Sequence, residues 1–203
     1  HLSLVVPYNT GTRIGETFAI DLSQDVDFEK HELRIHGQMQ KVEKTWYIKP
    51  PKYDSYRTIK MGETLEKELK FAIQQRRINK LKYGGAYSKT YLLPDRSIAQ
   101  IRADIDVPYK EILPLCVKEN GALLTPDSFK YCARIIHYEL NNPLFHAHCL
   151  RHTHGTILAE NGVNPKTVME RLGHKDITTT LQTYTFNTDA MQQTAVDVFE
   201  NAI

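Results

Sequence analysis

The spacing of hydrophobic residues in the first third of the chain predicts one short helix followed by several strands. Ile14 and Phe18 lie four residues apart among polar neighbours, which predicts a helix over residues 10–19. Short runs rich in β-branched and aromatic residues then predict strands at 26–28, 33–39, 45–48 and 57–61. Pro50 and Pro51 mark a strand end or a turn, because proline cannot donate to a strand ladder. Together these runs indicate a small antiparallel sheet.

A long amphipathic pattern follows and predicts a helix over residues 63–82. Charged residues cover one side of this helix, and the other side carries Leu65, Leu69, Ala72 and Ile73. Two glycines at 84–85 end the pattern. Residues 86–111 predict an extended, aspartate-rich connection with one short helix at 98–103. Residues 112–117 predict a further strand.

The remainder of the chain predicts helices. Their ranges are 125–140, 148–160, 165–172, 176–184 and 189–202. Pro126 suits a first helical turn, Asn164 before Pro165 suits a helix start, and Gly173 suits a helix end. We therefore expect an α+β fold that is mostly helical, with its small antiparallel sheet toward the N-terminal side and residues 1–203 forming one domain.

The composition fits a soluble globular protein, with 41% hydrophobic and 25% charged residues. No apolar run reaches the roughly 18 residues of a membrane span, and residues 1–7 lack a secretory signal. Cys116, Cys132 and Cys149 show no CxxC spacing, which favours buried thiols over a disulfide framework. We therefore expect a cytoplasmic protein. Because His1 replaces a starting methionine, we also expect a fragment of a longer chain.

Positive charge is concentrated in the middle of the chain. Residues 41–90 hold 13 Lys and Arg against 5 Asp and Glu, although the whole chain carries only +2. A basic segment suits a polyanionic partner such as DNA, because each neutralised phosphate releases counterions. A solvated helix face would give the same composition, so the charge alone leaves both interpretations open.

The chemistry-bearing residues of the second half gather at the start of a predicted helix. His148 and Arg151 are three residues apart and therefore share a helix face. Free N–H groups at a helix N-terminus favour a phosphate, and an arginine can bind two phosphate oxygens at once. Further along the chain, His174 follows Gly173, and Tyr184 comes ten residues after His174.

Four motifs in this order resemble the tyrosine recombinase family, also called phage-type integrases. They are TGTRIGE at 10–16, HCLRHTHGT at 148–156, LGH at 172–174 and TTLQTY at 179–184. The resemblance extends from residue 5 to residue 186 and is closest in texture to integrases of phages and conjugative transposons from Gram-positive bacteria. It implies the family's catalytic-domain fold, with the core-binding and arm-binding domains absent from this chain.

The resemblance also implies a role for each motif residue. Tyr184 would attack a DNA phosphate and form a 3′-phosphotyrosine, while Arg13 and Arg151 would stabilise the charge on the non-bridging oxygens. A phenol has a pKa of about 10, so the attacking oxygen needs a positive, proton-accepting surround. Glu16 occupies the position of the family's supporting acid. No metal or nucleotide cofactor is needed, because the phosphotyrosine keeps the energy of the broken bond.

Three further residues complete the implied catalytic set. His148 and His174 would donate hydrogen bonds to the phosphate or assist proton movement. Lys52, in a segment that resembles the family's lysine-bearing hairpin, would protonate the leaving 5′ oxygen. Lys49 and Lys60 lie close by, so the register of this hairpin leaves the identity of the lysine open.

Each residue also has an ordinary structural interpretation. Tyr184 could be a tyrosine at the edge of the core, and Arg13 could pair with Glu16 across one helical turn. His148 and His152 are four residues apart, a spacing that can bind zinc, although Arg151 beside them would repel a cation. The helix predicted at 189–202 packs either on its own domain or on a neighbouring subunit.

The resemblance implies an enzyme that cuts and rejoins double-stranded DNA during integration or excision of a mobile element. It implies a tetramer on DNA, with the C-terminal segment as a candidate contact between subunits. It implies neither a membrane partner nor a small-molecule substrate. Two alternatives stay open. One is an enzyme that relaxes DNA in the manner of a type IB topoisomerase, and the other is a DNA-binding relative without activity.

Overall fold

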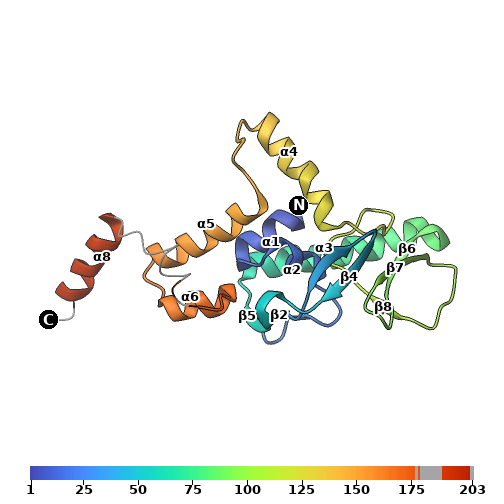
Figure 1. Cartoon of the computed structure of the whole chain (residues 1–203), viewed down its shortest axis with the longest axis horizontal. Helices are drawn as coiled ribbons and strands as arrows, with labels where there is room; N and C mark the ends of the chain where they lie inside the picture. Colours follow the sequence, from blue (N-terminus) through green and yellow to red (C-terminus); the bar gives the residue numbers. More distant parts are fainter. Residues whose placement is uncertain (177, 179–188, 202–203) are drawn as a thin grey trace.

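The computed structural model describes residues 1–176, 178 and 189–201. Helices α1, α2 and α3 and a set of short strands form the body of the molecule, and α5 and α6 pack on it through α1 and β5 (Figure 1). Helix α4 projects from this body, and α8 lies at the far end of the chain (Figure 1). The predicted α+β fold is therefore confirmed, with more residues in helices than in strands.

The first part of the chain contains two helices where the sequence predicted one. Helix α1 (Leu2–Thr10) and helix α2 (Ile14–Ala19) replace the predicted helix at 10–19. Gly11 separates them with a φ of 69°, a left-handed conformation that ends α1 and that glycine adopts without strain. The prediction missed α1 because its apolar residues are too evenly distributed to form a clear stripe.

The strands form three small antiparallel sheets rather than the single sheet that was predicted. The first sheet has the order β1 (Val26–Asp27), β2 (Glu32–Ile35) and β5 (Arg57–Lys60), and the second pairs β3 (Gln38–Val42) with β4 (Thr45–Lys49). The strand predicted at 33–39 is wrong as a single unit, since the chain leaves β2 before Gly37 and enters β3 after it. A Cβ at Gly37 would lie 2.9 Å from Ile48 Cγ2, so a larger residue there would displace β4 or the Ile48 side chain.

Residues 88–112 form a third sheet, which corrects the extended connection predicted there. It has the order β7 (Ile98–Arg102), β6 (Ser88–Leu92) and β8 (Lys110–Ile112). The short helix predicted at 98–103 is wrong, because Asp95 organises a hairpin turn by accepting bonds from Ser97 N at 2.9 Å and Ser97 Oγ at 2.6 Å. The strand predicted at 112–117 is also wrong, since β8 ends at Ile112 and only isolated bridges follow at Pro114 and Val117.

The longer helices agree with their predicted ranges to within a few residues. They are α3 (Glu63–Tyr83), α4 (Phe129–Glu139), α5 (Ala147–Glu160), α6 (Pro165–Leu172) and α8 (Asp189–Glu200). The short 3-10 helices η1 (Lys52–Asp54), η2 (Gly84–Ala86) and η3 (Pro126–Ser128) connect other elements. Almost all of the helix predicted at 176–184 lies outside the described residues.

One hydrophobic core holds the body together. Its most buried members come from β2, α3 and the segment after β8, and they include Leu33, Ile35, Leu65, Leu69 and Leu115. Val168 and Leu172 of α6 form a smaller cluster with residues of α5. All three cysteines are free, and burial raises the pKa of the Cys116 thiol to about 12. In the described part of the chain, no helix combines the length and apolar character that a membrane span requires.

Candidate active site

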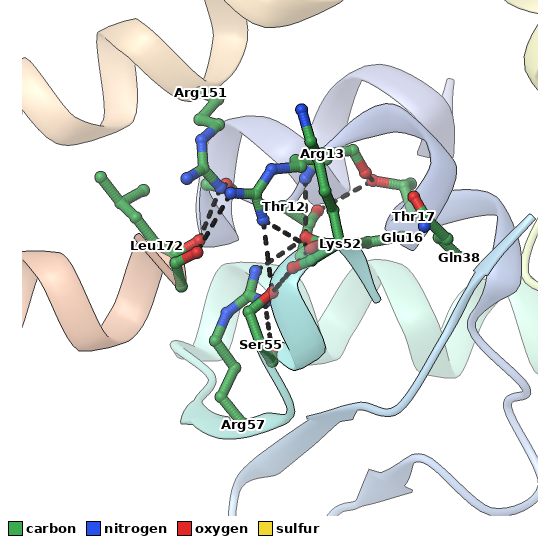
Figure 2. Close-up of polar contacts among 12 residues, drawn as sticks. Thr12, Arg13, Glu16, Thr17, Gln38, Lys52, Ser55, Arg57, Arg151 and Leu172 are labelled. Carbon is green, nitrogen blue, oxygen red and sulfur yellow. Dashed lines mark hydrogen bonds and ion pairs between the residues drawn. The ribbon is translucent and has the colours of Figure 1, made fainter. Parts of the chain in front are cut away.

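Arg151 on α5 is the most deeply placed of the predicted site residues. Only 1% of the residue is exposed, and its Nη1 donates to two backbone carbonyls, Gly11 O and Leu172 O, both at 2.7 Å. Gly11 follows α1 and Leu172 ends α6, so this side chain joins three elements and is held in one orientation (Figure 2). A buried arginine carries its charge at a high desolvation cost, which hydrogen bonds of this kind offset.

Arg13 stands at the N-cap of α2, and Glu16 holds it there. Glu16 Oε2 accepts from Arg13 N at 2.9 Å, which is the carboxylate half of a capping box, and Glu16 Oε1 accepts from Arg13 Nη1 at 2.8 Å. The expected pairing of Arg13 with Glu16 is therefore confirmed. Arg13 Nη2 also donates to Gly173 O at 3.0 Å, which brings this guanidinium to the end of α6.

A third arginine, Arg57 on β5, was not predicted as a site residue. Its Nη2 lies 2.8 Å from Glu16 Oε2, and 7% of its side chain is exposed. It shares the inner side of β5 with the buried Ile59. A charged residue at an inward position of an alternating strand was the signal available in the sequence, because a buried charge needs a partner.

The environment of Glu16 keeps this carboxyl ionised. Burial alone would raise its pKa, since the side chain has no solvent exposure. The hydrogen bond and positive charge of Arg57, followed by the contacts with Arg13, outweigh burial and lower the pKa below its usual value. Glu16 is therefore a fixed negative charge between two guanidinium groups.

The C-terminal end of α6 receives all three arginines. The carbonyls of Arg171, Leu172 and Gly173 accept, in that order, from Arg57 Nε at 2.8 Å, Arg151 Nη1 at 2.7 Å and Arg13 Nη2 at 3.0 Å. These carbonyls lie at the negative end of the helix dipole and have few partners within the helix, so they suit cations. Residues 171–173, which overlap the LGH motif, thus form a backbone platform that binds arginines from three other elements.

His148 and His174 lie close to the two predicted catalytic arginines. Desolvation, then the positive charges of Arg151 and Arg13, lower the pKa of His174 to about 4. Desolvation of part of the ring, followed by His152 and Arg151, lowers the pKa of His148 to about 4, although this residue is exposed as a whole. Both rings are therefore neutral at physiological pH and can each donate one N–H to an anion.

The two remaining histidines of the motif pack within the domain. His152 meets the ring of His148 edge to face, with 4.5 Å between the ring centroids. His154 Nδ1 lies 2.8 Å from Tyr8 O, and His154 Nε2 accepts from Arg171 Nε at 3.0 Å. Within the described part of the chain, no three His, Cys, Asp or Glu side chains form a group that could hold a metal ion.

Lys52 begins η1, in the turn between β4 and β5. Ser55 Oγ donates to Lys52 O at 2.9 Å and lies 3.5 Å from Arg13 Nη1, so the turn adjoins the arginine cluster. In Figure 2 the Lys52 side chain points to the same side as Arg13 and Arg151. It is exposed, and its Nζ lies 4.9 Å from the centre of the Tyr53 ring.

A groove of about 670 Å³ borders the cluster between β5 and α6, and its lining includes Ser55, Arg57, Gly173 and His174. The structure thus brings together Arg13, Arg151, His148 and His174 and places Lys52 in the adjoining turn. Tyr184, the predicted nucleophile, lies outside the described residues.

Two arginines and two neutral histidines thus come together from separate motifs of the chain, and the profile of one known family covers all of these motifs. The profile of the phage integrase family matches residues 2–191. The chain belongs to the phage integrase family. This membership covers α1 to α6 and the segment that follows them, and therefore every predicted site residue.

Curated relatives of this family member include proteins of bacteria and of their mobile elements. A tyrosine recombinase XerC-like protein of Caldanaerobacter subterraneus is 28% identical, over 97% of this chain and 48% of its own length. The transposase from transposon Tn916 of Enterococcus faecalis is 27% identical, over 89% of this chain and 40% of its own length. The chain thus spans about half the length of the curated relatives it matches.

Solved structures share the fold of this family member. The Tn1549 transposon integrase in complex with a circular intermediate DNA aligns with a TM-score of 0.71 at 24% identity, over 96% of this chain and 57% of that one. The XerH site-specific recombinase bound to palindromic difH substrate aligns with a TM-score of 0.58 at 22% identity, over 98% of this chain and 45% of that one. The predicted tyrosine recombinase catalytic-domain fold is therefore confirmed.

Proposed function

We propose that this chain is the catalytic domain of a site-specific DNA recombinase that cuts and rejoins strands through a 3′-phosphotyrosine. The observation that carries the proposal is the convergence of Arg13, Arg151, His148 and His174 at the C-terminal end of α6. The motif that contains Arg13 lies more than a hundred positions before the motifs of the other three residues, yet all four form one cationic site of the kind that a phosphodiester requires. The names of the relatives support integration or excision of a mobile element as the biological setting.

In the proposed reaction the two arginines act on the phosphate itself. The transition state carries extra negative charge on the non-bridging oxygens, and guanidinium groups that are already oriented stabilise it without reorganisation. Carbonyl acceptors at 2.7–3.0 Å fix Arg13 and Arg151 before the substrate arrives. Loss of one such donor typically costs on the order of a hundredfold to a thousandfold in rate.

The histidines act as neutral donors and as carriers of a proton. Because the pKa of each ring is about 4, His148 and His174 enter the reaction uncharged. A bound phosphate would raise both pKa values, because its negative charge offsets the neighbouring arginines. Either ring is then able to hold the proton that leaves the attacking phenol.

Tyr184 is the proposed nucleophile of the transesterification, and Lys52 is the proposed acid that protonates the leaving group. The phenolic oxygen of Tyr184 forms a bond to phosphorus while the bond from phosphorus to the 5′ oxygen breaks. The tyrosine proton passes to a base in the site, and the leaving 5′ oxygen takes a proton from Lys52. The number of phosphoester bonds is unchanged, so the reverse reaction rejoins the strand without a cofactor.

The proposed partners are double-stranded DNA and further copies of the chain. A structural neighbour was solved with a circular intermediate DNA, which supports a DNA partner here. The proposed assembly is a tetramer in which the segment that contains α8 contacts a neighbouring subunit. Since the relatives are about twice as long, the complete protein would add domains that bind the flanking DNA.

Trapping of a covalent intermediate tests the proposed function. The protein is incubated with a nicked attachment-site duplex, and an adduct that resists denaturant is measured on a gel. We expect an adduct with the wild type and none with Tyr184→Phe. Tyr138→Phe is the matched control, since Tyr138 is 79% exposed on α4, and it should behave as the wild type.

Two results would contradict the proposal. An adduct that persists in Tyr184→Phe would move the nucleophile to another residue. Relaxation of supercoiled plasmid without any sequence requirement would favour an enzyme of the type IB topoisomerase kind.

A further inference from the structure

We infer that Arg57 is a positioning residue that balances the charge of Glu16 and so leaves Arg13 with a net positive charge for the phosphate. This inference rests on the proposed function, because it assigns a role within that same site. Arg57 itself has no role among the residues that the sequence motifs single out. Its assignment comes from how the two oxygens of Glu16 are shared.

Glu16 divides its hydrogen bonds between two arginines. Its Oε1 accepts from Arg13 Nη1 at 2.8 Å and from Arg57 Nη1 at 3.3 Å. Its Oε2 accepts from Arg13 N at 2.9 Å and from Arg57 Nη2 at 2.8 Å. Each oxygen therefore serves both arginines, and neither arginine has the carboxylate to itself (Figure 2).

The sharing decides the charge that the site offers to an anion. The side chains of Arg13, Glu16 and Arg57 together carry one net positive charge. Without Arg57, the carboxylate of Glu16 would neutralise Arg13 at a site where solvent screens the pair weakly, because the Glu16 side chain is fully buried and only 20% of the Arg13 side chain is exposed. Arg13 would then meet the phosphate as half of a neutral ion pair.

Arg57 also ties the acid to the backbone platform at the end of α6. Its Nε donates to Arg171 O at 2.8 Å and its Nη1 donates to Ser55 O at 3.0 Å, so all three guanidinium nitrogens are engaged. Ser55 belongs to the turn that carries Lys52. One side chain therefore connects Glu16 with the turn after η1 and with the end of α6.

Two substitutions separate the charge of Arg57 from its hydrogen bonds. Arg57→Lys keeps the positive charge and loses the fork, whereas Arg57→Gln keeps polar donors and loses the charge. We expect the Lys variant to form the covalent adduct within about tenfold of the wild-type rate and the Gln variant to be slower by a further tenfold or more. DNA affinity should change far less than the cleavage rate, because Arg57 does not touch the phosphate in this assignment.

A double variant gives a result that a purely structural role would not give. Glu16→Gln combined with Arg57→Gln removes both opposite charges, so Arg13 regains its net positive charge. We expect the double variant to form the adduct faster than Arg57→Gln alone when both are measured well below their melting temperatures. A double variant that is slower than Arg57→Gln would overturn the inference.

The titration of Glu16 provides a second measurement that does not depend on cleavage. Arg13 at the N-cap of α2 and Arg57 from β5 face this carboxyl directly. Three further groups face these two arginines: Arg171 of α6, His174 after α6 and His148 of α5. We expect carbon NMR of the Glu16 carboxyl, assigned with Glu16→Gln, to show a higher pKa in Arg57→Gln and a value near wild type in Arg57→Lys. Unchanged titration in Arg57→Gln would contradict the charge balance even if the wild type formed no adduct.

Arg102→Gln is the matched control. Arg102 pairs with Asp104 at 2.7 Å on the surface of the third sheet, with 62% of its side chain exposed. It should cleave as the wild type does, because its ion pair is remote from Glu16. If Arg57→Gln does not fold, Arg57→Lys decides, and a folded Lys variant slower than wild type by more than a hundredfold would overturn the inference.

Discussion

His154 is a side chain whose surroundings fix its own protonation state. Its Nδ1–H donates to Tyr8 O, and its Nε2 accepts from Arg171 Nε. A protonated imidazole has no acceptor, so the second contact requires the neutral ring. Desolvation, followed by the charge of Arg171, lowers its pKa to about 4 and agrees with this requirement.

This histidine makes stability depend on pH in a definite direction. The folded pKa of about 4 lies below the usual value of 6.5, so between these values the unfolded chain binds more protons than the folded one. The free energy of unfolding should therefore fall as pH drops from about 6.5 to 4, with His148 and His174 adding in the same direction.

His154→Leu tests this dependence. At pH 7.5 it should lower the free energy of unfolding by about 1 kcal/mol, because Arg171 Nε and Tyr8 O lose a half-buried partner. Its further loss between pH 6.5 and 4.5 should be smaller than that of the wild type. Urea denaturation at several pH values measures both effects. His1→Gln, at a ring with 67% of its side chain exposed, is the control and should follow the wild type, whereas an equal pH dependence in His154→Leu would refute the assignment.

Residue types and local spacing predicted much of the site, and long-range contacts supplied the rest. Arg13 with Glu16, and His148 with Arg151, lie within single helical turns, so the sequence contains their relation directly. Arg57 meets Glu16 across 41 positions, and only the folded chain shows that pairing.

At the scale of elements, the glycine that ends α6 has a requirement of its own. Gly173 adopts a φ of 68°, and a Cβ there would lie 2.7 Å from Arg57 Nη1 and 3.1 Å from Ser55 Cβ. Gly162, after α5, has a similar φ of 71°, yet a Cβ there would meet nothing within 4 Å. The two glycines therefore share a backbone requirement and differ in their surroundings.

Alanine at each glycine separates these two effects. Both variants should lose roughly 1–2 kcal/mol of stability, because alanine disfavours the left-handed region. Only Gly173→Ala should also slow formation of the covalent adduct, by about tenfold or more, since it displaces Arg57 from the platform. Thermal unfolding and adduct kinetics measure the two quantities. Equal adduct rates in Gly173→Ala and Gly162→Ala would show that the platform tolerates the displacement.

The elements that the sequence predicted well are those with a strong internal period. Helix α3 carries apolar residues at helical spacing on one face, and its ends fall within a residue of the prediction. The strands β6 and β7 were missed because their exposed and buried positions do not alternate regularly. Their structure depends on hydrogen bonds between the two strands, which the spacing of residues does not reveal. Helix α1 was missed for a related reason, since packing against α5 and α2 stabilises it.

At the scale of the whole molecule, α8 stands apart from the rest of the described chain. Its side chains from residue 192 to residue 200 are exposed, and they include the large apolar residues Val196, Val198 and Phe199. Apolar side chains on an exposed helix indicate a partner that covers them. In the proposed assembly that partner is a neighbouring copy of the chain on DNA, which corresponds to one of the two alternatives left open by the sequence.

Substitution of this surface distinguishes assembly from folding. Val196→Ser combined with Phe199→Ser should leave the free energy of unfolding within about 0.5 kcal/mol of the wild type, because neither residue is buried in the single chain. The same variant should shift complexes on attachment-site DNA from tetramers to smaller species, as measured by analytical ultracentrifugation. Gln192→Ser combined with Gln193→Ser, at exposed positions of the same helix, is the control and should assemble normally. A clear loss of stability in the isolated double variant would instead place α8 against its own domain, and the tetramer contact would then have to come from another surface.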